Sequence, residues 1–440
     1  MGNGRRSFVS EVLVKRHRRH SLLAALVLAG AAAGAQPAGK VLSLQDCLRL
    51  ARQAQSSLTI ARQQVEIARL AVSQVRAGFL PQSHLGNNFI YNSPLLHDRT
   101  TFSFIPLNAI REYSSLLTTT LELDSSGRLR AELARARAGQ KVAEAEARLS
   151  ERDLKRAVTA AYFRALLARH VLEATGDSLA EAQEFRRRAE LLFEKGEAAR
   201  ADMVKAAAAV ALLEQSRQQA ELEARLAMQE LASFWTTEVD QPIQLEDPLS
   251  EPPPAPEDAQ PGKPFLKRPE FLVIEAQQRA AQADARRARS DLLPQFSLAF
   301  QYGLDSWRVR WADRGYAAFL TLNVPVFDWL RARNAERQAQ WRSRQLGAER
   351  AAAERTFARD YQAALARVRQ IYSQIAVARS QVQLCEESLR LSRLRYEGGE
   401  GSALDVVTAQ AQLTQARTNY YATLAGYWNA RADLEVASGR

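Results

Sequence analysis

Cysteine and histidine are scarce in this chain, and their scarcity excludes two classes of protein. The 440 residues include two cysteines, Cys47 and Cys385, and five histidines, of which His17 and His20 lie within the first 35 residues. Two cysteines cannot hold together a disulfide-rich scaffold, and the remaining scattered histidines do not make a His/Cys metal site. We therefore expect no bound metal and no cofactor. Both cysteines fall in expected helices, which favours two buried thiols over a disulfide.

The chain also lacks a long hydrophobic run. Its extended apolar segment, Leu22 to Ala33, is shorter than the roughly 20 residues of a membrane-spanning helix. A basic stretch from Lys15 precedes this segment and the small residues Ala33-Gly34-Ala35 end it, an order typical of a signal peptide. We predict that residues 1–35 form a signal peptide that directs export, with a retained amphipathic anchor as the alternative.

Positive charge is in excess, but much of the excess belongs to the predicted signal peptide. The formal net charge is +11, of which +5 lies in residues 1–35 and +6 in the rest of the chain. So small an excess on the exported chain is a weak basis for nucleic-acid binding, and we expect no nucleic-acid partner.

Proline is absent from two long tracts. None of the 15 prolines lies between Leu107 and Gln241 or between Val326 and Arg440, whereas eight fall between Pro248 and Pro269. Proline disrupts helix interiors, and strong helix formers dominate both tracts, so the tracts predict very long helices. The proline-rich stretch predicts an extended connector. We divide the chain into a signal peptide (1–35), a first repeat (36–247), a connector (248–268) and a second repeat (269–440).

The two halves of the chain repeat one another. Three pairs of segments match in the same order, at offsets of 213, 201 and 203 residues. Such an ordered set indicates an internal duplication of about 200 residues rather than a short solenoid repeat. The pairs are Leu80-Pro81-Gln82 with Leu293-Pro294-Gln295, Leu121-Glu122-Leu123 with Leu322-Asn323-Val324, and Phe193-Glu194-Lys195-Gly196-Glu197 with Tyr396-Glu397-Gly398-Gly399-Glu400.

Each half contains two segments in which apolar residues alternate with others. Such alternation predicts strands with one apolar face, and runs of about 9–13 residues are long enough to cross a bilayer when tilted. A soluble β-sandwich or hairpin with a buried face is the alternative. Four strands cannot close a membrane barrel, since barrels begin at about eight, so several chains would have to share one. The apolar positions are Leu85, Phe89 and Tyr91; Tyr113, Leu117, Leu121 and Leu123; Phe296, Leu298, Phe300 and Tyr302; and Tyr316, Ala318, Leu320, Leu322 and Val324.

The last helix shows a heptad pattern that pairs large residues with small ones. This pattern predicts a coiled coil in which each half forms an antiparallel helical hairpin. The turns of the hairpins fall at Gly196 and at Gly398-Gly399, and the long arm from residue 128 to 195 would measure roughly 100 Å. The large positions are Val406, Leu413, Tyr420, Tyr427 and Leu434, and the small positions are Ala409, Ala416, Thr423, Ala430 and Ala437.

Taken together, the export signal, the duplication, the Leu-Pro-Gln strand entries and the Tyr396 to Asp405 turn resemble the TolC family of outer-membrane efflux proteins. The resemblance covers roughly Val41 to Arg440. It implies a mixed α and β fold, mainly α. In that fold each chain of a homotrimer adds four strands to a shared 12-strand barrel in the outer-membrane lipid, and coiled hairpins form a periplasmic α-barrel. The resemblance also implies two partners, a periplasmic adaptor (membrane fusion) protein and an inner-membrane transporter.

Two residues at the second turn match the gate of this family. Tyr396 and Asp405 match its tyrosine and its first pore aspartate, whereas Gly401 stands at the gate arginine position and Thr408 at the second pore aspartate position. A ring of Asp405 from three chains would attract cations at a constriction, because converging like charges focus negative potential. The alternative for Asp405 is a helix-capping role. Asp202 is the duplicate of Asp405 and is the fourth candidate gate residue.

Both turns are rich in glutamate and glycine, and these residues are candidate contacts for the adaptor. The alternative is that the glutamates are only solvated turn residues. Trp307 and Trp311, in the loop between the last two predicted strands, fit an interfacial aromatic belt or packing within the loop. The candidate adaptor contacts are Glu194, Gly196, Glu197, Glu397, Gly399 and Glu400.

Catalysis has no support in the sequence. The glycine-rich stretch from Gly398 to Ser402 lacks the lysine of a phosphate-binding loop, and no serine has the spaced histidine and aspartate of a triad. We therefore expect no enzyme and assign no catalytic residue. The function we predict is the outer-membrane exit duct of a tripartite efflux or type I secretion system, whose cargo the sequence does not name. The alternatives are a periplasmic adaptor and a structural coiled-coil protein of the envelope.

Overall fold

The computed structural model describes residues 41–54, 56–91, 93, 111–256 and 262–439. The predicted signal peptide, residues 1–35, lies outside this description. The chain divides into two units, and the smaller one comprises residues 1–43 and 241–246. In the described part of this smaller unit, Leu42 and Leu245 form a parallel bridge. The larger unit holds every helix and strand discussed below.

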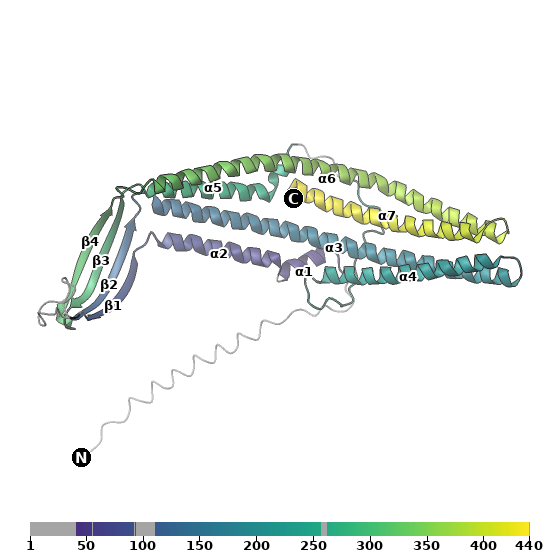
Figure 1. Ribbon diagram of the computed structural model, residues 1–440, viewed down its shortest axis with the longest axis horizontal. Coiled ribbons are helices and arrows are strands. Elements are labelled where there is room, and N and C mark those ends of the chain that lie inside the picture. Colours follow the sequence, from purple (N-terminus) through teal and green to yellow (C-terminus); the bar gives the residue numbers. More distant parts are fainter. Residues whose placement is uncertain (1–40, 55, 92, 94–110, 257–261, 440) are drawn as a thin grey trace, which may run out of the picture. The chain divides into compact units, whose positions relative to one another are not determined.

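The larger unit repeats one order of elements twice, as the duplication predicts. Helix, two-stranded antiparallel pair, long helix and returning helix follow one another in each half (Figure 1). The long helices α3 and α6 each have 67 residues, which corresponds to about 100 Å. The helices are α1 (Leu44–Gln53), α2 (Ser57–Ala77), α3 (Arg128–Glu194), α4 (Arg200–Ala232), α5 (Pro269–Ser290), α6 (Arg331–Glu397) and α7 (Ala403–Ser438). The strands are β1 (Gln82–Tyr91), β2 (Arg111–Leu123), β3 (Gln295–Ser306) and β4 (Arg314–Asn323).

The four strands form one antiparallel sheet in the order β1-β2-β3-β4, so the two repeats join between β2 and β3. Leu117 pairs with Leu85 on one side and with Tyr302 on the other, and Leu298 pairs with Leu121 and Leu320. Paired residues share a face of a sheet, so this register gathers the predicted apolar positions of all four strands on one face. The alternation predicted from the sequence is therefore real and continuous across the repeat boundary.

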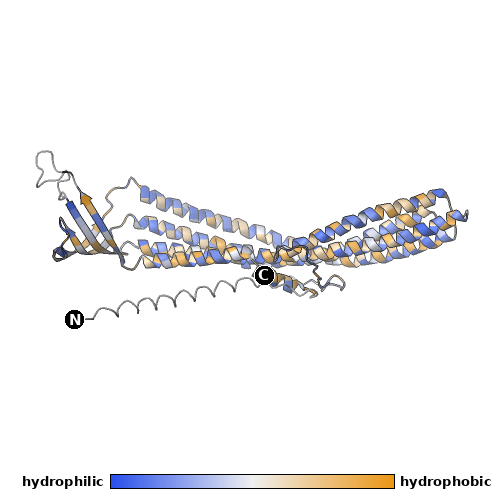
Figure 2. Cartoon of the chain, turned by 90° about the horizontal axis from the view of Figure 1, so that it is seen from below, coloured by the Kyte–Doolittle hydropathy of each residue, from blue (hydrophilic) through white to orange (hydrophobic). Residues whose placement is uncertain are grey.

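The helical hairpins pack through the predicted heptad seam. In α7, the large residues Val406, Leu413 and Tyr427 are buried, and the small residues Ala409, Ala416, Ala430 and Ala437 are buried with them. Tyr420 and Leu434 are half-buried. Helix α4 follows the pattern less well, because Val210 and Leu231 are buried whereas Arg217 is exposed. Figure 2 shows hydrophobic and hydrophilic residues interspersed along the long helices.

None of the helices in the described ranges combines the length and the hydropathy that a bilayer crossing requires.

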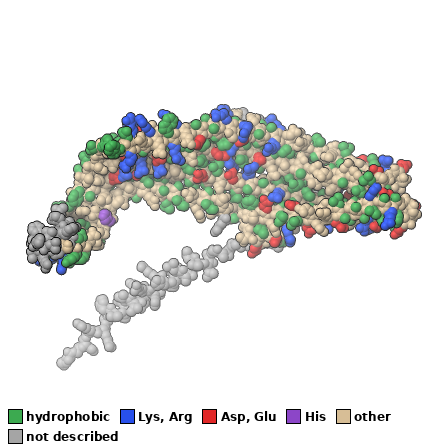
Figure 3. All heavy atoms as spheres, viewed as in Figure 1, with side chains coloured by type: hydrophobic (Ala, Val, Ile, Leu, Met, Phe, Trp, Pro, Cys, Tyr) green, Lys and Arg blue, Asp and Glu red, His purple; other side chains and the backbone are tan. Residues whose placement is uncertain are grey.

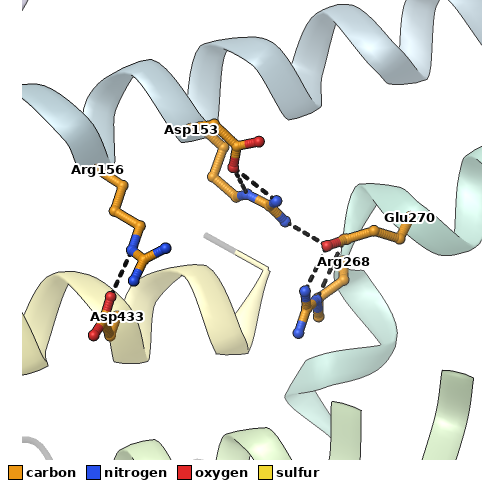
Figure 4. Close-up of polar contacts among 6 residues, drawn as sticks. Asp153, Arg156, Arg268, Glu270 and Asp433 are labelled. Carbon is orange, nitrogen blue, oxygen red and sulfur yellow. Dashed lines mark hydrogen bonds and ion pairs between the residues drawn. The ribbon is translucent and has the colours of Figure 1, made fainter. Parts of the chain in front are cut away.

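Two groups of ion pairs join α3 to α5 and α3 to α7 near the middle of the long helices (Figure 4). Glu270, at the start of α5, binds Arg152 of α3 at 2.8 Å and its neighbour Arg268 at 2.5 Å. Arg156 of α3 binds Asp433 of α7 at 2.6 Å. Burial alone would raise the pKa of Glu270, but the hydrogen bonds from Arg268 and Arg152 lower it to about 2. Glu270 is therefore ionised at neutral pH and joins the two repeats through its arginine partners.

The first part of the proline-rich connector is neither helix nor strand, and it contacts α7. The described residues 248–256 contain no helix or strand, and the hydroxyl of the buried Tyr427 donates to the carbonyl of Pro254 at 2.5 Å.

Both cysteines are free. Cys47 is fully buried, which together with Asp46 raises the pKa of its thiol to about 12. Cys385 is half-buried rather than buried, because it lies at the edge of the hydrophobic cluster around Tyr396.

Candidate functional site: an uncovered sheet and a paired-hairpin tip

The apolar face of the sheet is uncovered. Phe300, Tyr302 and Tyr316 are 47%, 45% and 79% exposed although they are large and hydrophobic. A soluble sheet buries such a face against a second layer, and an apolar face of this kind without a cover marks contact with another apolar phase. The exposed members of the face are Leu85, Phe89, Tyr91, Leu117, Leu123, Leu298, Phe300, Tyr302, Tyr316, Leu320 and Leu322.

The opposite face of the same strands is largely polar. Ser297 pairs with Glu122 and with Thr321, and Thr118 pairs with His84 and with Gln301. Strands of 10, 13, 12 and 10 residues suit a tilted crossing of a bilayer. Apolar-out and polar-in alternation over this length is the pattern of a transmembrane barrel strand.

The sheet has two free edges, β1 and β4. Each edge presents unpaired backbone groups, which proteins cover, charge or pair with another strand. In a bilayer an open edge is excluded, since no water is present to satisfy the backbone. If the sheet lies in a membrane, β4 of one chain must pair with β1 of another.

Exposed tryptophans lie at the end of the sheet farthest from the helices. Trp307 and Trp311 are 56% and 80% exposed, and Trp311 is the first residue of the short 3₁₀ turn Trp311–Asp313 before β4. The guanidinium of Arg308 lies 3.3 Å from the centre of the Trp307 ring. Exposed indoles beside a cation fit a membrane interface, where a ring can lie among headgroups.

The two tip turns share one backbone design. Gly196 and Gly399 both adopt a left-handed conformation, with φ of 78° and 74°. After each glycine, the backbone amide of the next residue donates a hydrogen bond to a carbonyl of the preceding helix. The Glu197 amide donates to the Leu192 carbonyl, and the Glu400 amide donates to the Arg395 carbonyl. A residue with a side chain is disfavoured in this conformation, so glycine is required at both helix ends. The turns predicted at these glycines are where the structure places them.

Tyr396 lies between the two hairpins. It is 6% exposed, and its ring packs edge-on against Phe185 of α3 with the ring centres 5.1 Å apart. Its hydroxyl has no hydrogen-bond partner among the described residues. Desolvation, and then the charge of Asp202 on α4, raise the pKa of Tyr396. The charge of Asp202 thus acts on Tyr396 from the other hairpin, and both are candidate gate residues.

Asp405 and Thr408 lie on α7, three residues apart and therefore on one face. The Asp405 carboxylate accepts from the Ser402 amide at 3.0 Å, and the Ser402 hydroxyl accepts from the Asp405 amide at 3.3 Å. This capping box lowers the pKa of Asp405, so the carboxylate is charged at neutral pH. The capping alternative is therefore realised, and both Asp405 and Thr408 remain exposed.

The predicted adaptor-contact residues all lie on the exterior of the turns. Glu194, Glu197, Glu397 and Glu400 are exposed. Glu397 also binds Arg188 of α3 at 3.2 Å. The three other glutamates form no ion pair with described residues, which leaves their charge available to a partner.

Sequence patterns missed the ion pairs that join the hairpins next to Tyr396. Glu181 of α3 binds Arg393 of α6 at 3.0 Å and Arg417 of α7 at 3.8 Å. These residues are more than 200 positions apart in the chain, so helical periodicity does not relate them. Glu181, Arg188, Arg393 and Glu397 line a cavity of about 60 Å³ beside Tyr396. Three arginines that the sequence did not single out therefore pair with glutamates around the candidate gate residue Tyr396.

Comparisons with known proteins identify the family. A family model described as "Outer membrane efflux protein" matches residues 47–236 and 265–440. The chain belongs to the outer membrane efflux protein family. This membership confirms the resemblance drawn from the sequence and favours the channel interpretation over the adaptor and the structural coiled coil.

One sequence relative and several solved structures are also similar to this chain. Outer membrane protein OprJ of Pseudomonas aeruginosa is 26% identical over 204 residues, which cover 42% of this chain and 43% of OprJ. The match thus spans less than half the length of this relative. The CmeC outer membrane channel of Campylobacter jejuni is 17% identical with a TM-score of 0.79 over 90% of this chain and 85% of CmeC. The MtrE outer membrane channel of Neisseria gonorrhoeae, in its open state, is 21% identical with a TM-score of 0.74 over 90% and 88% of the two chains. At these identities the structures show a shared fold, mainly helical with four antiparallel strands.

Proposed function

We propose that the protein is the outer-membrane exit duct of a tripartite efflux or type I secretion system, and that it works as a homotrimer. The observation that carries this proposal is the sheet, with its continuous uncovered apolar face, its polar opposite face and its two free edges. Three copies of four strands give 12, enough to close a barrel in outer-membrane lipid. The polar faces then line a water-filled passage.

The helices supply the periplasmic part of the proposed duct. Helices α3 and α6 leave the sheet and reach the tip turns about 100 Å away. Three copies of the two hairpins would surround a tube that continues the barrel. We propose that a periplasmic adaptor protein binds at the exposed tip glutamates, and that an inner-membrane transporter delivers the cargo into the tube.

The proposed periplasmic gate combines a charged ring with a latch between hairpins. Asp405 and Thr408 share an exposed face of α7, so three chains would present a ring of three carboxylates. Tyr396 of one hairpin packs against Phe185 of the other, so separating the hairpins would open their contact. Because Gly401 offers no gate arginine, we assign closure to the pairs that Arg188, Arg393 and Arg417 form.

A measurement of oligomeric state and conductance tests this function. The mature protein is extracted from outer membranes, its mass in detergent is measured, and it is then inserted into a planar bilayer. We expect a trimer with discrete conductance steps. A monomer or hexamer that is soluble without detergent and gives no conductance would show that the sheet is not a membrane barrel, and would support an adaptor instead.

A further inference from the structure

The two long helices begin in chemically different ways, although they are duplicates. Residues 124–127, before α3, are Asp-Ser-Ser-Gly. The segment before α6 instead exposes Val326, Phe327 and Trp329 at 92%, 71% and 83%. The rings of Phe327 and Trp329 pack edge-on with their centres 4.6 Å apart. Of the two described segments that lead from the sheet into a long helix, only the second therefore exposes bulky apolar side chains.

The backbone of this segment is strained in order to present these side chains. Trp329 and Leu330 have φ of 53° and 61°, whereas the first repeat uses Gly127, at φ 79°, before its long helix. Residues with a Cβ are disfavoured in the left-handed region. Such strain persists where a function retains it. An exposed tryptophan at a position that suits glycine indicates that the ring itself is used.

The arginines at the start of the two long helices also differ between the repeats. In α3, Arg128 binds Glu122, and Arg130 binds Asp124 at 2.6 Å. In α6, Arg331, Arg333 and Arg337 are all exposed and form no ion pair with any described residue. Two of them lie in the first turn of the helix, where the helix dipole disfavours positive charge. These unpaired guanidinium groups are therefore free to bind anions.

Nearby acidic groups do not neutralise these arginines. The Asp328 carboxylate accepts from the Ala332 amide at 2.8 Å and so caps the helix. Glu336 accepts from Gln340 at 3.0 Å. Figure 3 shows hydrophobic and basic side chains next to one another where the helices meet the sheet. This combination of exposed rings and guanidinium groups matches the water–lipid boundary of a bilayer whose headgroups are negative.

A second copy of the chain is a poorer occupant for this surface. Closure of the barrel places the β4 edge of one chain beside the β1 edge of the next. Strand β1 contains no acidic residue, and α2, which leads into it, contains Arg62, Arg69 and Arg76 but only Glu66. Glu66 already binds Arg69 at 3.0 Å. The neighbouring chain therefore offers positive charge, which would repel the arginines of α6.

We propose that the second repeat binds the negatively charged headgroups of membrane phospholipids where the sheet meets α6. The rings lie at the headgroup level and the arginines bind the phosphates. We call this surface the Trp329 collar; it consists of Val326, Phe327, Trp329, Arg331, Arg333 and Arg337. The proposal rests on the proposed function, because it requires the sheet to lie in a bilayer. It gives the duct a preference for anionic lipid that the barrel face alone does not supply.

Electron spin resonance with spin-labelled lipids tests the collar. The full mature protein is reconstituted in phosphatidylcholine bilayers that carry a trace of spin-labelled phosphatidylglycerol or spin-labelled phosphatidylcholine. We expect the wild type to restrict the motion of phosphatidylglycerol more than that of phosphatidylcholine. Each arginine near an anionic surface favours contact with the anionic lipid about fivefold. The measured preference is smaller, because it is averaged over lipids around the whole barrel perimeter. The preference for phosphatidylglycerol in R331Q/R333Q/R337Q should therefore fall at least about twofold. The variant R331K/R333K/R337K should keep most of it.

A matched control lies farther along the same helix. Arg350, Arg355 and Arg367 are also exposed and form no ion pair with described residues, but they lie about 28–54 Å from the start of α6. R350Q/R355Q/R367Q should therefore leave the lipid preference unchanged. An equal loss in this control, or an unchanged preference in R331Q/R333Q/R337Q, would overturn the collar. So would dissociation of the trimer in R331Q/R333Q/R337Q without a change in lipid preference, which would assign the surface to a second copy. A wild type that restricts neither lipid would overturn the proposed function and the collar together.

Discussion

The sheet and the helical tip expose different kinds of surface. On the sheet, large apolar residues such as Phe300 and Tyr316 are exposed. At the tip, charged residues such as Glu194 and Glu400 are exposed beside apolar ones such as Leu191, while small apolar residues such as Ala189 and Ala403 are fully buried. The two ends of α3 and α6 are therefore built for different surroundings. The sheet requires an apolar phase to cover it, whereas the tip buries its small apolar residues between helices and mixes charged and apolar side chains on its surface.

This difference predicts where a new charge does harm. A charge on the apolar face of the sheet is harmful because it remains exposed to lipid. A charge inside the tip is harmful because it becomes buried. Substitutions that place or remove one charge test this difference. Their controls lie on the opposite face of the same strand or helix, or at a neighbouring ion pair.

The largest effect is expected from Leu298→Lys in β3. Leu298 is on the apolar face, and a lysine that faces lipid near the bilayer centre costs about 2–4 kcal/mol in each of three chains. The variant should fail to accumulate as trimer in the outer membrane, measured by membrane fractionation and unheated gel electrophoresis. Ser297→Lys, one residue earlier on the polar face, should still assemble. If both variants assemble equally well, the apolar face does not contact lipid.

The next largest effect is expected from Ala409→Glu in the tip. Ala409 is 4% exposed in the cluster formed by Phe185, Val406 and Leu413. An unpaired buried charge costs about 3–5 kcal/mol, so the hairpins should separate locally. Cells that carry the variant should become more susceptible to large antibiotics, whereas Ala411→Glu, at an exposed position of the same helix, should not change susceptibility. Wild-type susceptibility in Ala409→Glu would show that this seam does not close the tip.

A smaller effect is expected midway between the two regions, at Glu270. Its pKa is lowered from 4.5 to about 2 in the folded chain, so its stabilisation is present above about pH 4.5 and is lost as the pH falls toward 2. Glu270→Gln should lower the free energy of unfolding by about 2 kcal/mol at pH 7. The difference from wild type should shrink below pH 4.5, as measured by thermal denaturation.

A neighbouring ion pair supplies the control for Glu270. The pair between Arg156 and Asp433 is more exposed, with 57% and 33% of the two side chains accessible (Figure 4). Asp433→Asn should therefore change stability by less than about 1 kcal/mol. A larger effect of Asp433→Asn than of Glu270→Gln would show that the joint between the repeats lies at α7 rather than at α5.

Local sequence patterns predicted most of the fold because each pattern occurs in both repeats. Alternation in β3 and β4 predicted the face of each strand, and the glycines at 196 and 399 predicted both turns. The sequence also contained the capping box, since Ser402 and Asp405 have its spacing. The burial of Tyr396 could not be predicted in this way, because Phe185 of α3, more than 200 residues earlier, creates it. The same holds for the ion pairs of Glu181, which depend on how two hairpins pack rather than on the period of either helix.

The smallest structural effect, and the sharpest test of the tip, is expected from Asp405→Asn. The asparagine side-chain oxygen can still accept from the Ser402 amide, so the cap should persist and thermal stability should stay near that of wild type. Only the charge is lost, and a ring of three carboxylates would lose its attraction for cations. Single-channel recordings in a salt gradient should therefore show lower cation selectivity.

Ser402→Ala is the complementary variant, because it removes the cap and keeps the charge. It should cost about 1 kcal/mol of stability and leave selectivity largely intact. In the wild type, the bonds to Ser402 hold the pKa of Asp405 below its usual value, so selectivity should begin to fall at a lower pH than an ordinary aspartate would give. If Asp405→Asn destabilises the protein without changing selectivity, Asp405 serves only as a cap. The exposed charge of the tip would then belong to the adaptor surface, and the pore constriction would have to be assigned to the uncharged face around Thr408.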